Sequence, residues 1–391
     1  MLQAACRAGE ARNVRVWAQR INVHGETMNM IKRTALLAAS CFLAACASTG
    51  KQFPMIHESA HTAAGAVEKT LPAGEALAML RQLSPHADMA EAVYRRDLAV
   101  SERQERACDY VTATDAPALR SGLPDGWVRL NQQLVKQLGM QPAAGQGGPL
   151  QPCRGAKGLQ YETYIRLDAA GRPLEAVLAF RGTENTTYEW RSDWIANFSN
   201  VDFGVGANPQ FSEARTEGGR LIEALVRVLP KTTSSAVCKA AMGRDEGVQA
   251  PIDLVGHSLG GGLAQHLAYS SKACDVRATV AFDPSPATGW FFLHWRNYVV
   301  TKDPHISRVY LDGEALSFVR KISTRFNHAR DYRRDIRMTF PDVDVGAFGR
   351  HSMTLLAAGI KYAANGLPPD DTEKRIDYAS AVVYPESLSQ N

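Results

Sequence analysis

The sequence has little net charge where it is expected to fold. Residues 1–45 hold six of the 44 lysines and arginines and two of the 40 acidic residues, which leaves 38 of each sign in the remainder. Nucleic-acid binding needs a basic surface, so this class of function is excluded and no nucleic-acid partner is expected. No CxxC pair or His/Cys cluster has the spacing of zinc ligands, so neither a metal site nor a cofactor is expected.

The chain also lacks a hydrophobic run long enough to span a bilayer. Residues 34–42 form a short apolar run that follows a basic segment, and residues 43–46 are Leu-Ala-Ala-Cys. This order is typical of a secretory signal peptide, which we place at residues 28–45. Residues 1–27 precede it and are interpreted as a spurious upstream extension, with the true start at Met28 or Met30.

Leu-Ala-Ala-Cys resembles the lipobox of bacterial lipoproteins, in which the cysteine becomes the first mature residue and carries the lipid. The resemblance implies that Cys46 is lipidated and that the protein is attached to a membrane of the cell envelope. Ala47 is not the aspartate that retains many lipoproteins at the inner membrane, which favours the outer membrane. An ordinary cleaved signal with a coincidental cysteine is the alternative.

Cysteine is sparse, and three of the seven precede the expected mature domain. The other four are Cys108, Cys153, Cys238 and Cys274. An even number in an oxidising compartment is compatible with two disulfides, and proximity favours Cys108–Cys153 and Cys238–Cys274 among the three connectivities. Free buried thiols are the alternative.

The mature chain is expected to form a tether followed by one large domain. Residues 46–75 show no clear periodicity and are interpreted as the tether. The domain is placed at residues 76–368, and residues 369–391 form a tail. Apolar residues recur at helical spacing from residue 77 to 110, with a break predicted at Ser84-Pro85.

Strands and helices then alternate. Residues 161–167 and 174–180 predict a hairpin that leads into a buried strand, and residues 252–255 and 278–282 predict further buried strands. Residues 211–229 and 259–269 have helical patterns. This alternation predicts an α/β fold with a mostly parallel central sheet flanked by helices.

The segment Gly256-His257-Ser258-Leu259-Gly260 lies where a predicted strand ends and a helix begins. A GxSxG pattern in this context predicts the nucleophile elbow of an α/β-hydrolase fold, with the Ser258 hydroxyl pointing out above the sheet. The backbone N–H of Leu259 and the helix N-terminus can then stabilise an oxyanion. A strand-to-helix turn without chemistry is the alternative.

A second motif, Phe180-Arg181-Gly182-Thr183, precedes the first. Together they resemble the class 3 lipase family, over residues 161–364. The resemblance implies a serine hydrolase in which Thr183 supplies the second oxyanion contact.

A serine nucleophile needs a histidine base and an acid, which follow it in this fold. His351 stands before an apolar helix, a setting similar to that of the family's catalytic histidine. Where the family usually has Gly-Asp-x-Val, this chain has Gly313-Glu314, so Glu314 is the first candidate for the acid. Asp312 and Asp283 remain alternatives.

These features favour a lipid-anchored serine esterase or lipase that cleaves acyl esters at the bacterial envelope. Phospholipase A1 activity is the nearest alternative, and a non-catalytic envelope lipoprotein that keeps the fold is another. The aromatic residues 289–295 are expected near the mouth of the site, as an acyl pocket or lid, or else packed on the N-terminal helices. The oligomeric state is left open.

Overall fold

The computed structural model describes residues 55–62, 65–99, 102–103, 106–112, 116–142, 148–154, 159–182, 209–233, 238, 248–301, 304–317, 333–340, 347 and 349–365. All of them belong to one compact unit, Phe53–Asn391. The expected signal peptide, Cys46 and the C-terminal tail lie outside the described residues.

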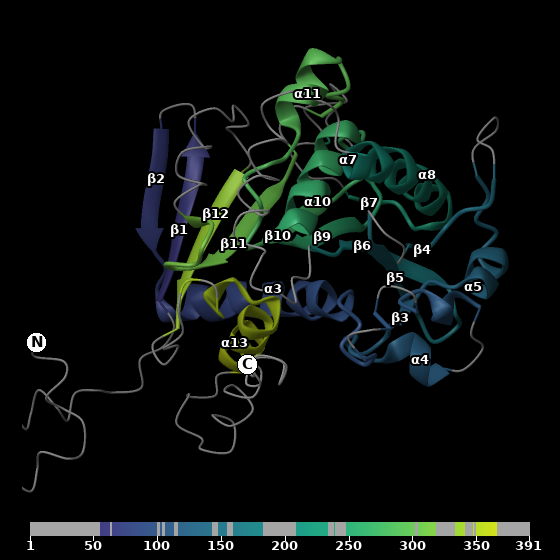
Figure 1. Cartoon of the computed structure of the whole chain (residues 1–391), viewed down its shortest axis with the longest axis horizontal. Coiled ribbons are helices and arrows are strands. Elements are labelled where there is room, and N and C mark those ends of the chain that lie inside the picture. Colours follow the sequence, from purple (N-terminus) through teal and green to yellow (C-terminus); the bar gives the residue numbers. More distant parts are fainter. Residues whose placement is uncertain are drawn as a thin grey trace, which may run out of the picture. The chain divides into compact units, whose positions relative to one another are not determined.

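Within the described part of the chain, ten strands form one sheet whose centre is parallel (Figure 1). The central strands, in spatial order, are β12 (Arg333–Thr339), β11 (Ile306–Leu311), β10 (Ala278–Phe282), β9 (Ile252–His257) and β6 (Pro173–Phe180). All five end at the same edge of the sheet, because their directions agree.

Both sides of this centre are antiparallel. On one side lie β1 (Met55–Thr62) and β2 (Gly65–Thr70), and on the other β5 (Tyr161–Leu167), β3 (Trp127–Arg129) and β4 (Cys153–Arg154). The sheet is therefore mixed, and the prediction of a mostly parallel sheet is wrong. The reason is that the β1–β2 and β5–β6 hairpins reverse the chain direction at each side.

Strands β1 and β2 also correct the expected tether at residues 46–75. β1 pairs with β12 and with β2, so much of this range belongs to the sheet. Its polar side chains make ion pairs across strands: Glu58 with Arg334 at 2.6 Å and Glu68 with Arg337 at 2.6 Å. A charged strand of this kind suits the side of a sheet that meets water.

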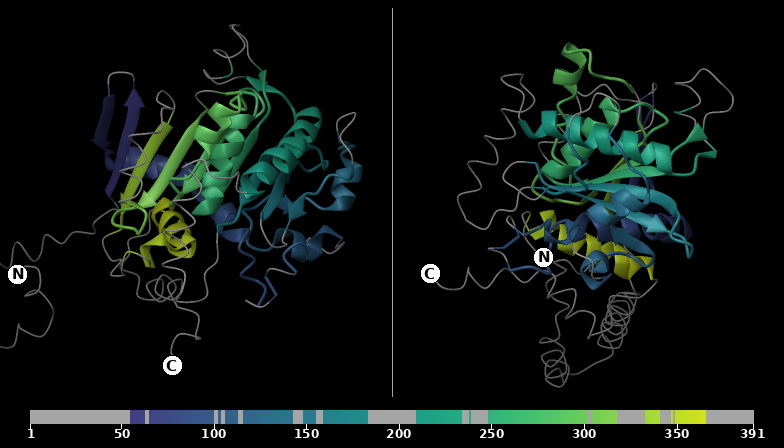
Figure 2. Two further views of the ribbon diagram at one scale, coloured as in Figure 1. Left: turned by 45° about the horizontal axis from the view of Figure 1, so that its top comes forward. Right: turned by 90° about the vertical axis from the view of Figure 1, so that its right-hand side faces the viewer.

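Helices cover both faces of the sheet (Figure 2). One face carries α3 (Ala73–Ala92) and α13 (Met353–Ala364), and the other α7 (Pro209–Glu213), α8 (Gly219–Val228) and α10 (Leu259–Ser270). Alternate residues of β6 enter the two cores, with Val177 on the first face and Leu178 on the second.

Helix α3 continues through Pro85, so the predicted break is wrong. Its buried face extends on both sides of the proline, with Leu80 and Leu83 before it and Ala87 and Ala90 after it. Packing on α13 and the sheet outweighs the lost backbone hydrogen bond. No described helix is both long and apolar enough to cross a membrane.

Short elements complete the described fold. They are η1 (Asp109–Val111), α4 (Ala116–Arg120), α5 (Gln132–Gln137), the π-helix η2 (Ala214–Gly218), β7 (Thr232–Thr233), β8 (Val248–Gln249), α11 (Trp290–Trp295) and η3 (Gly349–His351). The structure pairs Cys108 with Cys153 and Cys238 with Cys274, the two connections that proximity favours.

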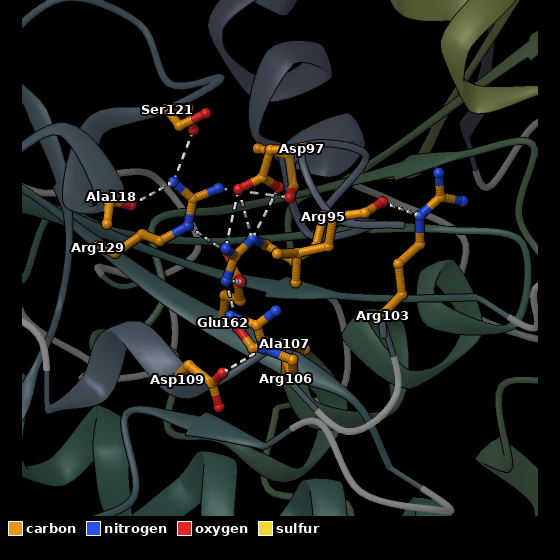
Figure 3. Close-up of polar contacts among 12 residues, drawn as sticks. Arg95, Asp97, Arg103, Arg106, Ala107, Asp109, Ala118, Ser121, Arg129 and Glu162 are labelled. Atoms are coloured by element: carbon orange, nitrogen blue, oxygen red, sulfur yellow. Dashed lines mark hydrogen bonds and ion pairs between the residues drawn. The ribbon is translucent and has the colours of Figure 1, made fainter. Parts of the chain in front are cut away.

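A buried charge cluster holds the turn after α3 (Figure 3). Arg129 Nε donates to Glu162 Oε2 at 3.0 Å, and the hydroxyl of Tyr164 donates to the same oxygen at 2.7 Å. Arg95 lies 3.7 Å from Glu162 and makes a bidentate pair with Asp97. Burial alone would lower the pKa of Arg129, but the carboxylate of Glu162 raises it above its ordinary value. The cluster fixes the polypeptide next to Tyr94.

Candidate active site

Ser258 lies at the sharp turn between β9 and α10. Its backbone has φ 56° and ψ −124°, a conformation that residues other than glycine rarely adopt. Flanking glycines allow the turn: a Cβ on Gly256 would lie 2.2 Å from the carbonyl oxygen of Gly260, and one on Gly260 would lie 2.2 Å from that of Phe180. The turn therefore has the strained, crowded backbone that the GxSxG pattern predicts.

His351 bridges Ser258 and Glu314. Its Nε2 lies 3.0 Å from Ser258 Oγ, and its Nδ1 lies 2.8 Å from Glu314 Oε2. A carboxylate can only accept, so Nδ1 carries the proton and Nε2 presents its lone pair to the serine hydroxyl. This is the tautomer in which an imidazole can take a proton from serine.

Glu314 is held rigidly for this contact. It follows the turn at the end of β11, and its side chain is fully buried. The same Oε2 atom accepts a hydrogen bond from the backbone N–H of Leu316 at 2.8 Å. The His351 ring and this backbone N–H both hold the carboxylate in place.

The two other candidate acids lie differently. The side chain of Asp312 is 51% exposed and faces Arg337 at 3.7 Å. Asp283 follows β10, is fully buried and accepts from the backbone N–H of Leu311 at 3.1 Å. The structure thus brings Glu314 to His351, leaves Asp312 at the surface, and places the buried Asp283 carboxylate within 4.8 Å of a ring nitrogen of His351.

Asp283, His257 and His351 are residue types that can ligate a metal ion, and they lie close together. The Asp283 carboxylate and one ring nitrogen each of His257 and His351 lie within 4.8 Å of one another. However, both ring nitrogens of each histidine already have hydrogen-bond partners. Hydrogen bonding accounts for the arrangement, and a metal would have to displace one of these hydrogen bonds at each histidine.

Of the two expected oxyanion contacts, Leu259 lies within the described residues and Thr183 does not. Ser258 is the N-cap of α10, so the backbone N–H of Leu259 belongs to the first turn of the helix, whose N–H groups have no acceptor within the helix. Thr183 lies outside the described residues. Its neighbour Gly182 packs against the elbow, because a Cβ there would lie 2.9 Å from the Cβ of Ser258.

Two residues that sequence reasoning did not single out, His257 and Tyr94, also belong to the site. His257 Nε2 lies 3.0 Å from the backbone oxygen of His351, and Nδ1 lies 2.6 Å from the hydroxyl of Tyr94. The position of His257 inside the pentapeptide was visible in the sequence, although its contacts were not. No sequence signal connects Tyr94 with a site 163 residues away.

Among the residues that the structure describes, the aromatic segment packs beside the carboxyl-terminal half of α10. Leu293 packs with Tyr269 and Ile306, and the backbone N–H of Val300 donates to Tyr269 at 2.9 Å. Tyr269 is ten residues from the first residue of α10, so these contacts lie about 15 Å along the helix from its start. Trp295 is 68% exposed there.

No protein-family model and no curated protein matches the chain. Among solved structures it is similar to the crystal structure of extracellular lipase LipA from Serratia marcescens, with 16% sequence identity and a TM-score of 0.27. The likeness covers 62% of this chain and 39% of that chain. It is too slight to support a conclusion about activity, which must come from the side chains described above.

Proposed function

We propose that this protein is a serine hydrolase that cleaves carboxylic esters of lipids at the bacterial envelope. One observation supports this most: His351 lies 3.0 Å from Ser258 Oγ and 2.8 Å from the buried Glu314 carboxylate. A strained serine, a base in the correct tautomer and a fixed acid form the arrangement that activates a hydroxyl for acyl transfer.

In the first half-reaction, Ser258 Oγ attacks the acyl carbonyl while its proton passes to Nε2 of His351. The carbonyl electrons move onto oxygen, and the N-terminus of α10, with the N–H of Leu259, stabilises that charge. When the intermediate collapses, the C–O bond to the alcohol breaks. The alcohol takes the proton from His351, and the acyl group stays on Ser258.

In the second half-reaction, water gives a proton to the same nitrogen and attacks the acyl carbonyl. The acid product leaves and Ser258 recovers its proton. Glu314 remains ionised throughout and stabilises the imidazolium that forms twice in each cycle. Thr183 is proposed as the second oxyanion contact on the family resemblance.

A fluorophosphonate probe tests the proposal, because it reacts only with an activated serine. The mature domain should be labelled, and Ser258→Ala should not. Ser271→Ala is a matched control, since Ser271 is a buried serine at the opposite end of α10 and should leave labelling unchanged. An unlabelled wild-type protein would instead favour a non-catalytic lipoprotein.

Substrate class needs a separate measurement. Hydrolysis of triglycerides, phospholipids and short esters should be compared under one set of conditions. Release of the sn-1 acyl chain from phospholipids as the fastest reaction would make the protein a phospholipase A1, which uses the same chemistry.

The location at the outer membrane is also a proposal. It is supported by the resemblance of residues 43–46 to a lipobox. Incorporation of a clickable palmitate analogue should occur in the wild type and be absent in Cys46→Ala. Equal incorporation in both would refute lipidation at this cysteine.

A further inference from the structure

A chain of hydrogen bonds runs beneath the catalytic histidine, from the end of β6 to the backbone of His351. Its members are the backbone N–H of Gly182, the hydroxyl of Tyr94 and the ring of His257. The distances are 3.2 Å from Gly182 N to Tyr94 Oη, 2.6 Å from Tyr94 Oη to His257 Nδ1, and 3.0 Å from His257 Nε2 to the carbonyl oxygen of His351.

The direction of this chain follows from its two ends. A carbonyl oxygen can only accept, so His257 Nε2 must carry a proton and donate to His351. In the neutral ring Nδ1 is then an acceptor, and the Tyr94 hydroxyl donates to it. The Tyr94 oxygen keeps lone pairs and accepts the N–H of Gly182. All three hydrogen bonds can form together when His257 is neutral and Tyr94 is protonated.

Burial makes each link expensive to lose. Tyr94 is 4% exposed and His257 is 6% exposed, so water cannot easily replace a missing partner. Burial also raises the pKa of the Tyr94 hydroxyl well above its ordinary value, which keeps it a donor. The guanidinium of Arg181 lies over the Tyr94 ring at 5.5 Å.

We infer that Tyr94 and His257 are positioning residues of the proposed esterase, which hold the backbone of His351 and the end of β6 in register with Ser258. Both ends of this series of hydrogen bonds lie next to proposed catalytic groups. The His351 ring accepts from Ser258, and Gly182 precedes Thr183.

Kinetics test the inference in a protein that is still folded. Tyr94→Phe removes the hydroxyl and leaves two buried groups unpaired, so kcat should fall about tenfold or more while KM changes less than about twofold. Tyr110→Phe is the matched control, because Tyr110 is an equally buried tyrosine in the charge cluster, and its kcat should equal that of the wild type.

Two substitutions of His257 separate hydrogen bonding from packing. Gln offers one donor and one acceptor, so His257→Gln should retain more of kcat than His257→Leu, which offers neither. In the double variant Tyr94→Phe/His257→Leu, the loss should be no greater than in the worse single variant, because both break one chain. Fully additive losses, or a wild-type kcat in Tyr94→Phe, would overturn the inference.

A spectroscopic measurement does not depend on the proposed esterase activity. In protein labelled with ¹⁵N-histidine, the resonances that vanish in His257→Gln should show a neutral ring at pH 7, with the proton on Nε2. A proton on Nδ1, or on both nitrogens, would refute the chain. A wild type without turnover or fluorophosphonate labelling would refute the proposed function instead, and this spectrum would still decide the hydrogen-bond chain.

Discussion

The buried histidine in the elbow helix should make the protein sensitive to acid. His266 is 1% exposed and lies in α10, with Nδ1 3.0 Å from the carbonyl oxygen of Thr288 and its ring against Phe211. Burial lowers its pKa to about 4, and the Thr288 carbonyl opposes this only in part. The ordinary value, which the unfolded chain should have, is near 6.5.

The sign of the effect follows from proton binding. Between pH 6.5 and pH 4, His266 binds a proton in the unfolded state but stays neutral in the folded state, so acid favours unfolding. The stability from this group is fully present above pH 6.5 and is lost as the pH falls toward 4. At 1.36 kcal/mol per pKa unit, the loss is roughly 3 kcal/mol. Because α10 carries Ser258 at its N-terminus, activity should be lost with it.

Urea unfolding followed by circular dichroism at pH 7 and pH 4 measures this contribution. His266→Gln can still donate to Thr288 but cannot titrate, so its loss of unfolding free energy between the two pH values should be about 3 kcal/mol smaller than that of the wild type. In His294→Gln, which replaces an exposed histidine, the unfolding free energy should fall between pH 7 and pH 4 by as much as it does in the wild type. Equal losses in the wild type and His266→Gln would refute the reasoning.

Three further predictions concern the acid, the charge cluster and a disulfide. Glu314→Gln should lower kcat by roughly 10⁴-fold in steady-state ester hydrolysis, as amide replacement of a triad acid does, whereas Asp312→Asn should change it less than about twofold; the reverse ranking would assign the acid to Asp312. Glu162→Gln leaves a buried arginine without its counter-charge, so the free energy of unfolding in urea should fall by about 3 to 5 kcal/mol, and a loss below 1 kcal/mol would contradict this. The Cys238–Cys274 bridge spans 36 residues, so Cys238→Ser/Cys274→Ser should destabilise by about 4 kcal/mol, and an unchanged denaturation midpoint would count against the bridge.

Local patterns were sufficient to predict the elements that carry the candidate catalytic side chains. The strand, the GxSxG turn and the following helix are adjacent in the chain, so their chemistry is visible in one short segment. Aligning Gly313 with the family's glycine selected Glu314, and the structure places that carboxylate, not Asp312, beside His351. The β5–β6 hairpin was also predicted, because alternation and a turn mark it locally.

Features that depend on distant partners could not be predicted in this way. β1 and β2 are polar, and they belong to the sheet because their glutamates meet arginines of β12 far along the chain. The sequence of α3 contains a proline, and the packing that keeps the helix continuous comes from α13. Tyr94 meets His257 only because the fold brings α3 beneath the elbow.

The register of β1 has a consequence for the proposed attachment through a lipid on Cys46. Met55 pairs with Thr339, the last residue of β12, so the first strand starts at the edge of the sheet where the parallel strands end and where Ser258 follows β9. Eight residues lie between Cys46 and Met55, and the nine steps from one to the other reach about 30 Å in a fully extended chain. A lipid on Cys46 would keep the start of β1 within that distance of the bilayer, and β1 starts at the same edge of the sheet as the turn that carries Ser258.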